Sequence, residues 1–273
     1  MIQDISPHRF SNHYEEHTPD VDSRVMFVKD GRILAESKGA ASDFPAYSES
    51  AAFVKKYVYL FSIDDIKFFL AKEYEDVPAE GYQFYPLRDL YKFDKKYMAF
   101  AAVTAFQLSN WYEGNRFCGK CGKPLVHSSK ERMLQCSHCG NTVYPKISPA
   151  VIVAVTDGDR ILMTKYANRE YKRYALIAGF TEVGETLEET VSREVMEEVG
   201  VKVKNIQYYK CQPWSFSDSL LVGFFCELDG SDSIVLDKEE LSVGEWVHRD
   251  DIEVSYDGIS LTNEMIIKFK ENR

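Results

Sequence analysis

The sequence lacks any apolar run long enough to span a bilayer, and its first residues, MIQDISPHRFSNHYEEH, lack the charged-then-apolar layout of a signal peptide. We therefore expect no membrane partner and a cytoplasmic location. Basic residues are in deficit, with 33 Lys and Arg against 43 Asp and Glu, and they form no long run. Broad affinity for nucleic acid needs clustered positive charge. The net charge of −10 argues against it and favours metal ions as the bridge to an anionic substrate.

Cysteine is scarce, but four of the six cysteines form a pattern. Cys118 and Cys121 make one C-x-x-C knuckle, Cys136 and Cys139 make a second after fourteen residues, and a glycine follows each. This spacing is typical of a zinc ribbon, and four thiolates leave no position for water, so we expect a structural Zn²⁺. A redox pair or two disulfides are the alternatives. The 273 residues, 45% of them hydrophobic, suffice for two domains and this small insert.

The most acidic segment carries a helical pattern. Aliphatic residues recur every fourth position from Leu187 to Val199, which predicts a helix with one buried face. Glu194, Glu197 and Glu198 stand at i, i+3 and i+4, a spacing that crowds their carboxylates together. Hard divalent cations such as Mg²⁺ or Mn²⁺ relieve that repulsion best. A solvated acidic face is the alternative for a glutamate pair taken alone.

The residues around this helix have predictable roles. Thr186 and Glu189 have the spacing of a capping box, so the helix should begin there. Gly179 can let the backbone approach a ligand closely. Arg193 lies beside Glu185 in our reading and can orient a carboxylate.

The whole string from Gly179 to Val201, GFTEVGETLEETVSREVMEEVGV, resembles the complete box of the Nudix hydrolase family. The resemblance implies an α/β fold, an α/β/α sandwich with a mixed sheet, and hydrolysis of a nucleoside diphosphate linked to another group. It implies that the three helix glutamates are catalytic and bind Mg²⁺ or Mn²⁺, and that three further residues brace the box: Gly179, Glu185 and Arg193. Glu240 aligns with a later metal-binding glutamate, and Glu239 is the competing choice.

A second segment, Gln212 to Leu220 (QPWSFSDSL), is similar to the signature of the NADH pyrophosphatase branch of this family. That signature usually reads SQPWPFPxS, so Cys211, Ser215 and Ser217 depart from it. The resemblance implies substrate contacts by four of its residues: Gln212, Trp214, Phe216 and Ser219. An ordinary aromatic loop packed on the sheet is the alternative.

Other substrate contacts are implied outside this segment. The junction YPKISPAVI resembles the approach to the first catalytic strand of the branch, and its Tyr144 can stack on a base, with Phe180 supplying the opposite face. Each such stack contributes about 1–3 kcal/mol. Ala178 and Thr262 are further implied contacts, Thr262 in the first turn of an expected closing helix. Core packing is the alternative for either aromatic ring.

The chain is expected to have three parts. Residues 1–112, with alternating strand-like segments and a helix from about Lys95 to Trp111, look like a degenerate Nudix-like α+β domain. Residues 113–145 are the zinc ribbon, and residues 146–273 are the catalytic domain. After the box, we expect two strands flanking the QPWSFSDS loop.

The resemblance implies metal-dependent hydrolysis of the pyrophosphate bond of NAD(H) to nicotinamide mononucleotide and AMP. The same branch removes the NAD cap from RNA 5′ ends, so NAD-capped RNA is the second candidate substrate. The alternatives are a hydrolase of ADP-ribose or dinucleoside polyphosphates, and a non-catalytic protein that binds RNA or senses a nucleotide. A homodimer is expected from the resemblance.

Overall fold

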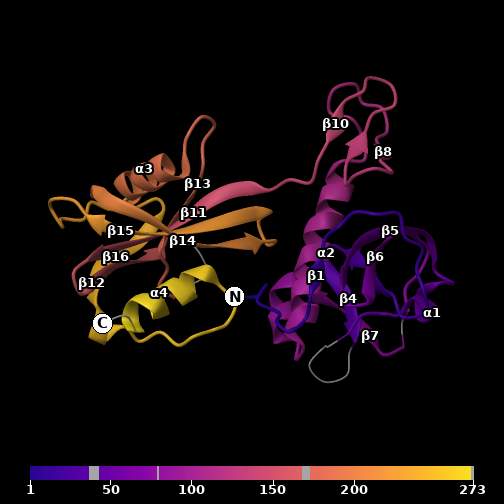
Figure 1. The fold of residues 1–273 in the computed structure, drawn as a ribbon, viewed down its shortest axis with the longest axis horizontal. Helices are drawn as coiled ribbons and strands as arrows, with labels where there is room; N and C mark the ends of the chain where they lie inside the picture. Colours follow the sequence, from indigo (N-terminus) through magenta and orange to yellow (C-terminus); the bar gives the residue numbers. More distant parts are fainter. Residues whose placement is uncertain (37–42, 79, 168–172, 272–273) are drawn as a thin grey trace. The chain divides into compact units, whose positions relative to one another are not determined.

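The computed structural model describes residues 1–36, 43–78, 80–167 and 173–271. The chain divides into two compact units (Figure 1), one of residues 2–146 and one of Met1 together with residues 147–273. The division falls one residue after the predicted start of the catalytic domain. The separation of the first unit into two domains stays a prediction.

The second unit is built on a six-stranded mixed sheet. Its order is β14-β15-β11-β12-β16, with β13 also paired to β11. The pair β11 and β15 is parallel and the other pairs are antiparallel. The strands are β11 (Ser148–Asp157), β12 (Arg160–Tyr166), β13 (Ile177–Phe180), β14 (Val203–Trp214), β15 (Ser219–Leu228) and β16 (Leu241–His248).

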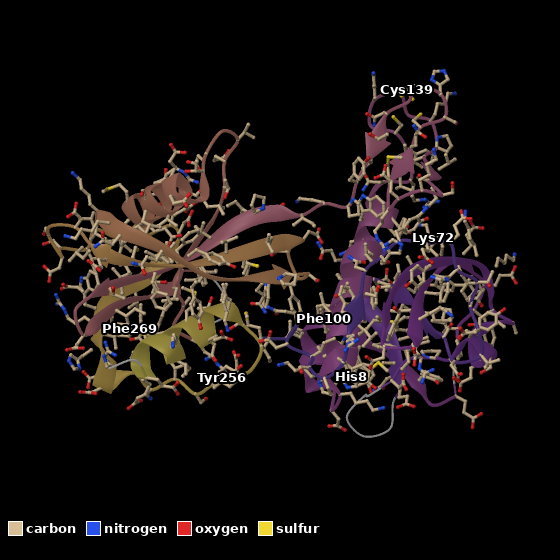
Figure 2. The ribbon with its side chains drawn as sticks, in the orientation of Figure 1. His8, Lys72, Phe100, Cys139, Tyr256 and Phe269 are labelled. Carbon is tan, nitrogen blue, oxygen red and sulfur yellow. The ribbon has the colours of Figure 1, made fainter. Side chains whose placement is uncertain are left out.

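Two helices cover opposite faces of this sheet (Figure 1), namely α3 (Leu187–Val199) and α4 (Leu261–Glu271). Side chains alternate between the faces of a strand. Val151 and Val153 of β11 accordingly pack in one core with the aliphatic side of α3, whereas Ile152 packs in another with α4. Phe269 of α4, labelled in Figure 2, belongs to that second core. The predicted α/β/α sandwich is confirmed.

Helix α3 begins and ends as its sequence predicts. The Thr186 side chain accepts a hydrogen bond from the Glu189 backbone N–H, and the Glu189 carboxylate accepts one from the Thr186 N–H, which completes the capping box. Gly200 ends the helix at φ 72°, a left-handed conformation that glycine adopts without strain. The predicted span of 187–199 is confirmed.

The segment expected as the QPWSFSDS loop is mostly strand. Gln212, Pro213 and Trp214 belong to β14 and pair with residues 219–221 of β15, so only residues 215–218 form the turn. Because β14 lies at the edge of the sheet, Pro213 can sit in it without breaking a central ladder. The prediction of a long loop was therefore wrong in its extent, since the antiparallel register continues to the turn.

The first unit has α+β character. Its four-stranded sheet has the order β1-β5-β6-β2 and its three-stranded sheet the order β3-β4-β7. The expected helix is present as α2 (Lys96–Gly114). The remaining elements are β1 (Phe10–Ser11), β2 (Arg24–Met26), β3 (Val28–Lys29), β4 (Arg32–Glu36), α1 (Tyr47–Ser50), β5 (Val54–Ile63), β6 (Ile66–Tyr74), β7 (Tyr82–Pro86) and the 3₁₀ helix η1 (Leu87–Lys92).

Three two-residue strands follow α2, in the order β10-β9-β8: β8 (Val126–His127), β9 (Leu134–Gln135) and β10 (Thr142–Val143). A second 3₁₀ helix, η2 (Arg249–Asp251), precedes α4 in the other unit. Among the helices of the described residues, none is long and apolar enough to cross a membrane.

Candidate active site and zinc cluster

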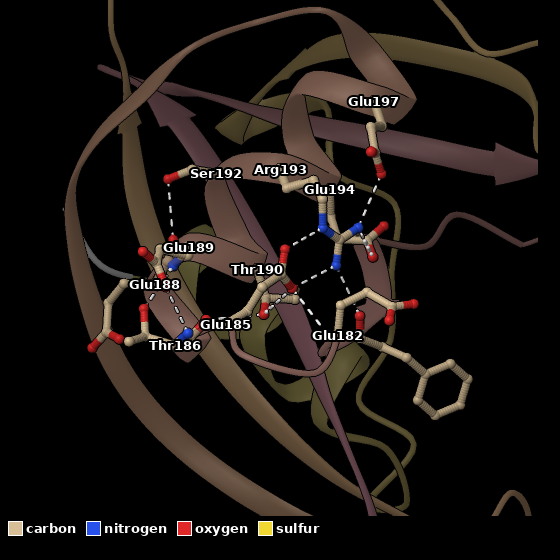
Figure 3. A network of polar contacts seen from close by, with 11 residues as sticks. Glu182, Glu185, Thr186, Glu188, Glu189, Thr190, Ser192, Arg193, Glu194 and Glu197 are labelled. Carbon is tan, nitrogen blue, oxygen red and sulfur yellow. Dashed lines mark hydrogen bonds and ion pairs between the residues drawn. The ribbon is translucent and has the colours of Figure 1, made fainter.

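Arg193 lies at the centre of the acidic box (Figure 3). Its Nε and Nη2 atoms donate to the two carboxylate oxygens of Glu185 at 2.6 and 2.9 Å. Such two-point arginine–carboxylate pairs fix orientation as well as charge. Nη2 also donates to the Phe180 carbonyl at 3.0 Å, which ties α3 to the end of β13. The predicted contact between Arg193 and Glu185 is confirmed.

The same guanidinium also gathers two of the predicted metal ligands. Its Nη1 donates to Glu194 Oε1 at 2.7 Å and to Glu197 Oε2 at 2.9 Å. Since both oxygens lie within 2.9 Å of one nitrogen, the two carboxylates converge on the same side of α3. Their side chains differ in exposure, 12% for Glu194 and 59% for Glu197. Glu197 thus has room to turn toward a cation.

The pKa values of Glu185 and Glu194, both bound to Arg193, are shifted in opposite directions. Hydrogen bonds from Arg193, and then from the Glu182 backbone N–H, lower the pKa of Glu185 to about 2. Burial raises the pKa of Glu194 above its ordinary value, and the neighbouring charges of Glu197 and Glu240 raise it further, against the opposing effect of Arg193. Glu240 therefore lies close enough to Glu194 to repel it. A divalent cation would relieve that repulsion.

Gly179 leaves the space that the Glu194 carboxylate occupies. A Cβ atom built on Gly179 would lie 1.9 Å from Cδ of Glu194 and 2.0 Å from its Oε1. Gly179 pairs with Val151 of the central strand β11, so pairing in the sheet holds its backbone. Position 179 must be glycine because the carboxylate of Glu194, a predicted metal ligand, lies where a Cβ atom would be. The sequence analysis did not predict this contact between Gly179 and Glu194.

Glu198 differs from its neighbours on the helix because it is buried, with 3% of its surface exposed. A buried carboxylate is expensive unless it is paired or bound to a cation. Carboxylate oxygens are the hard donors that Mg²⁺ and Mn²⁺ prefer. Among the described residues, Glu194 and Glu197 meet on Arg193, but Glu198 and Glu240 form no compact cluster with them. The type and charge of these donors fit such an ion.

The four ribbon cysteines form a much tighter group. Their sulfur atoms all lie within 4.8 Å of one another, with Cys118 and Cys139 3.7 Å apart and Cys121 and Cys136 3.5 Å apart. A tetrahedral zinc site with Zn–S bonds of about 2.3 Å has sulfur–sulfur edges of about 3.8 Å. All six cysteines of the chain are free thiols. The cluster therefore fits one structural Zn²⁺ and excludes the disulfide alternative in this structure.

Backbone turns prepare the cysteines for a cation. In each knuckle the glycine N–H bonds back to the first cysteine carbonyl, and both Gly122 and Gly140 have φ 72°. Burial opposes ionisation of Cys118, but backbone N–H groups of Lys120 and Cys121 outweigh it and lower its pKa to about 7. The Cys139 N–H likewise lowers the pKa of Cys136. Among the described residues, no other set of His, Cys, Asp or Glu is so compact.

The predicted substrate residues of the hairpin fall into two groups. Trp214 and Phe216 are half-buried, with ring centroids 4.7 Å apart. Gln212 and Ser219 are buried. The Gln212 amide donates to the Ile259 carbonyl and accepts from the Leu261 N–H, so it anchors the start of α4. Its role as a direct substrate contact stays a prediction.

The remaining predicted contacts lie apart in the chain. Phe180 is 54% exposed at the end of β13, and Ala178 is half-buried on the same strand. Thr262 is half-buried and lines a cavity of about 290 Å³ beside α4. Tyr144 belongs to the other unit, is 53% exposed and donates to Glu131 at 3.1 Å. Pairing of Tyr144 with Phe180 around a base stays a prediction.

Thr190 is a member of the site that the sequence analysis missed. It is fully buried, and its hydroxyl lies 3.0 Å from both Glu185 Oε2 and the Thr186 carbonyl oxygen, so its one proton can be donated to either. The signal available was a polar residue on the apolar side of the predicted helix, beside Val191. Such a residue needs a buried partner.

Comparisons with known proteins agree with this geometry. The NUDIX domain matches residues 146–266, and the NADH pyrophosphatase zinc ribbon domain matches residues 115–144. Over 151 residues the chain is 45% identical to the protein named NAD-capped RNA hydrolase NudC of Salmonella paratyphi C (strain RKS4594) and to that of Citrobacter koseri (strain ATCC BAA-895 / CDC 4225-83 / SGSC4696). These matches cover 55% of this chain and 58% of each relative, so the chain spans little more than half the length of the curated relatives it matches.

Among solved structures, the crystal structure of a NUDIX hydrolase from Nitrosomonas europaea is similar, with a TM-score of 0.50 and 21% sequence identity. The match covers 58% of this chain and 92% of the Nitrosomonas europaea chain. At this identity the likeness shows the fold alone.

Proposed function

We propose that the chain hydrolyses the pyrophosphate bond of NAD(H), because residues 146–266 match the NUDIX domain and residues 115–144 match the NADH pyrophosphatase zinc ribbon domain. Water adds to one phosphorus, the bridging P–O bond breaks, and nicotinamide mononucleotide and AMP are released. The same cleavage at the 5′ end of an NAD-capped RNA releases nicotinamide mononucleotide and leaves the RNA with a 5′ monophosphate. The observation that carries the proposal is the convergence of Glu194 and Glu197 on Arg193 inside an intact box.

Four glutamates would hold Mg²⁺ or Mn²⁺: Glu194, Glu197, Glu198 and Glu240. When bound, such ions neutralise the developing negative charge and lower the pKa of a bound water. The chain itself sets the orientation of these carboxylates. Nη1 of Arg193 holds Glu194 and Glu197, and Nε of the same guanidinium is held by Glu185.

Glu198 and Glu197 are the two candidates for the general base. Burial of Glu198 restricts its rotamers, which suits a group that must accept a proton at a fixed place. Glu197 is exposed and can move between Arg193 and a substrate-side position. Glu185 cannot serve, because its pKa of about 2 makes it a poor proton acceptor near neutral pH.

Aromatic residues supply the binding surface for the dinucleotide. Phe180 presents an exposed ring directly after Gly179, and its carbonyl accepts a hydrogen bond from Arg193 of the box. Trp214 and Phe216 offer a second pair of rings at the hairpin turn. Stacking on such rings accepts either base of NAD(H). We also propose that the protein acts in the cytoplasm as a homodimer.

Product analysis tests the proposal. Purified protein is incubated with NADH and, separately, with a short NAD-capped RNA, each with Mg²⁺ or Mn²⁺ and with the divalent cation omitted. Nicotinamide mononucleotide is the expected product in both cases, only with the cation. A much higher kcat/KM on the capped RNA assigns RNA as the main substrate, and the reverse assigns free NAD(H).

One observation favours a second candidate within the same chemistry. Ser215 and Ser217 stand in the hairpin where the NADH pyrophosphatase signature usually has proline, and loss of proline removes a restriction on φ. A hairpin altered in this way can suit ADP-ribose or a dinucleoside polyphosphate. A kcat/KM for either compound well above that for NADH would replace the NAD(H) assignment.

A further inference from the structure

A cavity of about 670 Å³ lies within the unit of residues 2–146, remote in sequence from the acidic box. It is lined by the segment Tyr14–Thr18, by strands β5 and β6, by the end of α2 and by strand β8 of the ribbon. Its volume is in the range of small-molecule sites, roughly 300–1,000 Å³. Neither the zinc cluster nor the proposed hydrolysis uses it.

One wall of the cavity is a fixed aromatic layer. His127 lies between Tyr14 and Tyr112, with ring centroids 5.4 and 5.3 Å away and interplanar angles of 28° and 26°. Tyr14 and Tyr112 place their hydroxyl groups 2.7 and 2.5 Å from the two ring nitrogens of His127. The layer therefore joins the ribbon, α2 and the N-terminal segment.

The hydrogen bonds assign the protons of this layer. Tyr14 donates its single proton to the Ser128 carbonyl at 2.9 Å, so His127 Nδ1 donates to Tyr14 and Nε2 accepts from Tyr112. Burial lowers the pKa of His127, which favours this neutral form. A neutral ring locked at both nitrogens offers a flat, uncharged surface for stacking.

Charged side chains lie around the aromatic layer. Lys56, Lys72 and Arg116 provide three cations, and Glu15 and Glu16 provide two carboxylates from the opposite segment. The Lys72 ammonium (labelled in Figure 2) lies 5.6 Å from the Tyr112 ring centroid and is held by Glu113 at 2.6 Å. The cations come from β5, β6 and the segment just after α2. Lys72 and Arg116 both reach Glu113, so these two cations lie close to one another.

Tyr57 is a further polar side chain of this cavity. It lines the same cavity, and its hydroxyl oxygen is buried without a hydrogen-bond partner among the residues that the structure describes. Buried polar atoms are nearly always hydrogen-bonded. Its oxygen is closed to solvent, so a bound molecule can reach it only if neighbouring side chains move.

We propose that this cavity binds a nucleoside monophosphate, with the base against the Tyr14–His127–Tyr112 layer and the phosphate toward Lys56, Lys72 and Arg116. The carboxylate of Glu16 suits a base that carries an exocyclic amine. A lipid tail does not suit a wall with five charged groups, and a free phosphate does not use the aromatic layer. Base stacking combined with cations is the usual chemistry of nucleotide recognition.

Photo-crosslinking of the full chain with 8-azido-AMP, followed by peptide mapping, tests this inference. Divalent cations are omitted to weaken binding at the acidic box. The expected label falls on peptides that contain Tyr14 or Tyr112, and unlabelled AMP competes with it. Labelling confined to residues 147–273 overturns the inference, and so does equal competition by inorganic phosphate.

Two variants sharpen the assignment. Lys72→Met keeps the aliphatic stem and removes the charge, and it should reduce cavity labelling about tenfold, whereas Lys238→Met, an exposed lysine of the other unit, should not. Val126→Trp, at a 51% exposed position that lines the cavity, should block labelling by filling it. Unchanged labelling in both cavity variants, at unchanged zinc content and Tm, overturns the inference.

The result is separable from the proposed hydrolysis. The cavity variants should keep kcat/KM for NADH within about twofold of the parent protein. If the parent protein labels in the cavity but cleaves no NADH, the inference stands and the proposed hydrolysis fails. If it cleaves NADH but labels only at residues 147–273, the hydrolysis stands and the inference fails.

Discussion

The cysteine cluster and the acidic box are two cation sites that differ in how their ligands are held and how exposed the ligands are. In the ribbon, four sulfur atoms already lie within 4.8 Å of one another, held by backbone turns. On α3, Glu194 and Glu197 are instead held by Arg193, and Glu197 is largely exposed. A structural zinc site is closed and complete, whereas a catalytic Mg²⁺ site must leave room for substrate and water. The difference separates a cation site that the fold completes by itself from one that leaves room for a further ligand.

The electrostatics of the two sites differ in the same way. Backbone N–H groups lower the pKa values of Cys118 and Cys136, whereas at Cys121 the lowering effect of the Lys123 N–H is outweighed by burial and the other sulfur atoms, which raise its pKa to about 12. At the acidic box, burial and neighbouring carboxylates raise the pKa of Glu194. The ribbon backbone favours thiolates at two of the four ligands, and the box retains a repulsion between carboxylates that Arg193 offsets only in part.

Removing ribbon ligands should give the largest effect. Cys118→Ser with Cys136→Ser should abolish zinc binding, whose apparent free energy in zinc-finger peptides is about 10–16 kcal/mol, and unfold residues 115–144. Zinc content by mass spectrometry and limited proteolysis measure this. Cys211→Ser is the matched control, since Cys211 is exposed and lies outside the cluster. Full zinc content in the double variant would contradict a four-cysteine site.

Removing a box carboxylate should stop the reaction and leave the fold intact. Glu198→Gln should reduce kcat for NADH by about 10²–10⁴-fold, the range expected for a lost general base. Zinc content and Tm should stay close to those of the parent protein. Glu188→Gln, an exposed glutamate in the first turn of the same helix, is the control. Turnover within tenfold of the parent protein would exclude Glu198 from the reaction.

A methyl group at Gly179 should disturb the box through packing. In Gly179→Ala the new Cβ overlaps the Glu194 carboxylate, so Glu194 must move. Overpacking of this kind costs about 1–3 kcal/mol of stability, and kcat for NADH should fall at least tenfold. Chemical denaturation and steady-state kinetics measure the two effects. Gly114→Ala, where a Cβ meets nothing within 4 Å, should change neither, and an unaltered kcat in Gly179→Ala would remove Glu194 from the site.

Acid should weaken the box by a smaller amount than any of these substitutions. The folded-state pKa of Glu185 is about 2, below its ordinary value of 4.5. The stability it contributes is therefore present above pH 4.5 and is lost as the pH falls toward 2. In Glu185→Gln the difference in Tm from the parent protein should shrink over this window. A constant difference from pH 6 to pH 2 would show that the Arg193 pair adds no stability through charge.

The local features of both sites followed from the sequence. Apolar spacing placed α3 at Leu187–Val199, Thr186 and Glu189 gave its cap, and glycines after each knuckle gave the left-handed turns. These features depend on residues at most four positions apart, so local geometry decides them. The predicted contact between Arg193 and Glu185, eight positions apart, needed the whole box pattern.

Contacts between distant segments were decided by the tertiary structure. The sheet register brings Gly179 against Glu194, and the turn just before β16 brings Glu240 near the same carboxylate. Gln212, predicted from its motif as a substrate contact, is buried and holds the start of α4 through hydrogen bonds to residues 259 and 261. No spacing in the sequence encodes these distances, because they depend on which strands pair and in what register.

The sequence by itself thus determined the chemistry of the two cation sites: sulfur ligands at knuckle spacing, and oxygen ligands at helical spacing. The tertiary structure decided which carboxylates are buried, which are held by Arg193, and where a cavity with an aromatic wall forms. The physical reason is that ligand type is a property of residues, whereas burial and convergence are properties of packing between segments far apart in the chain.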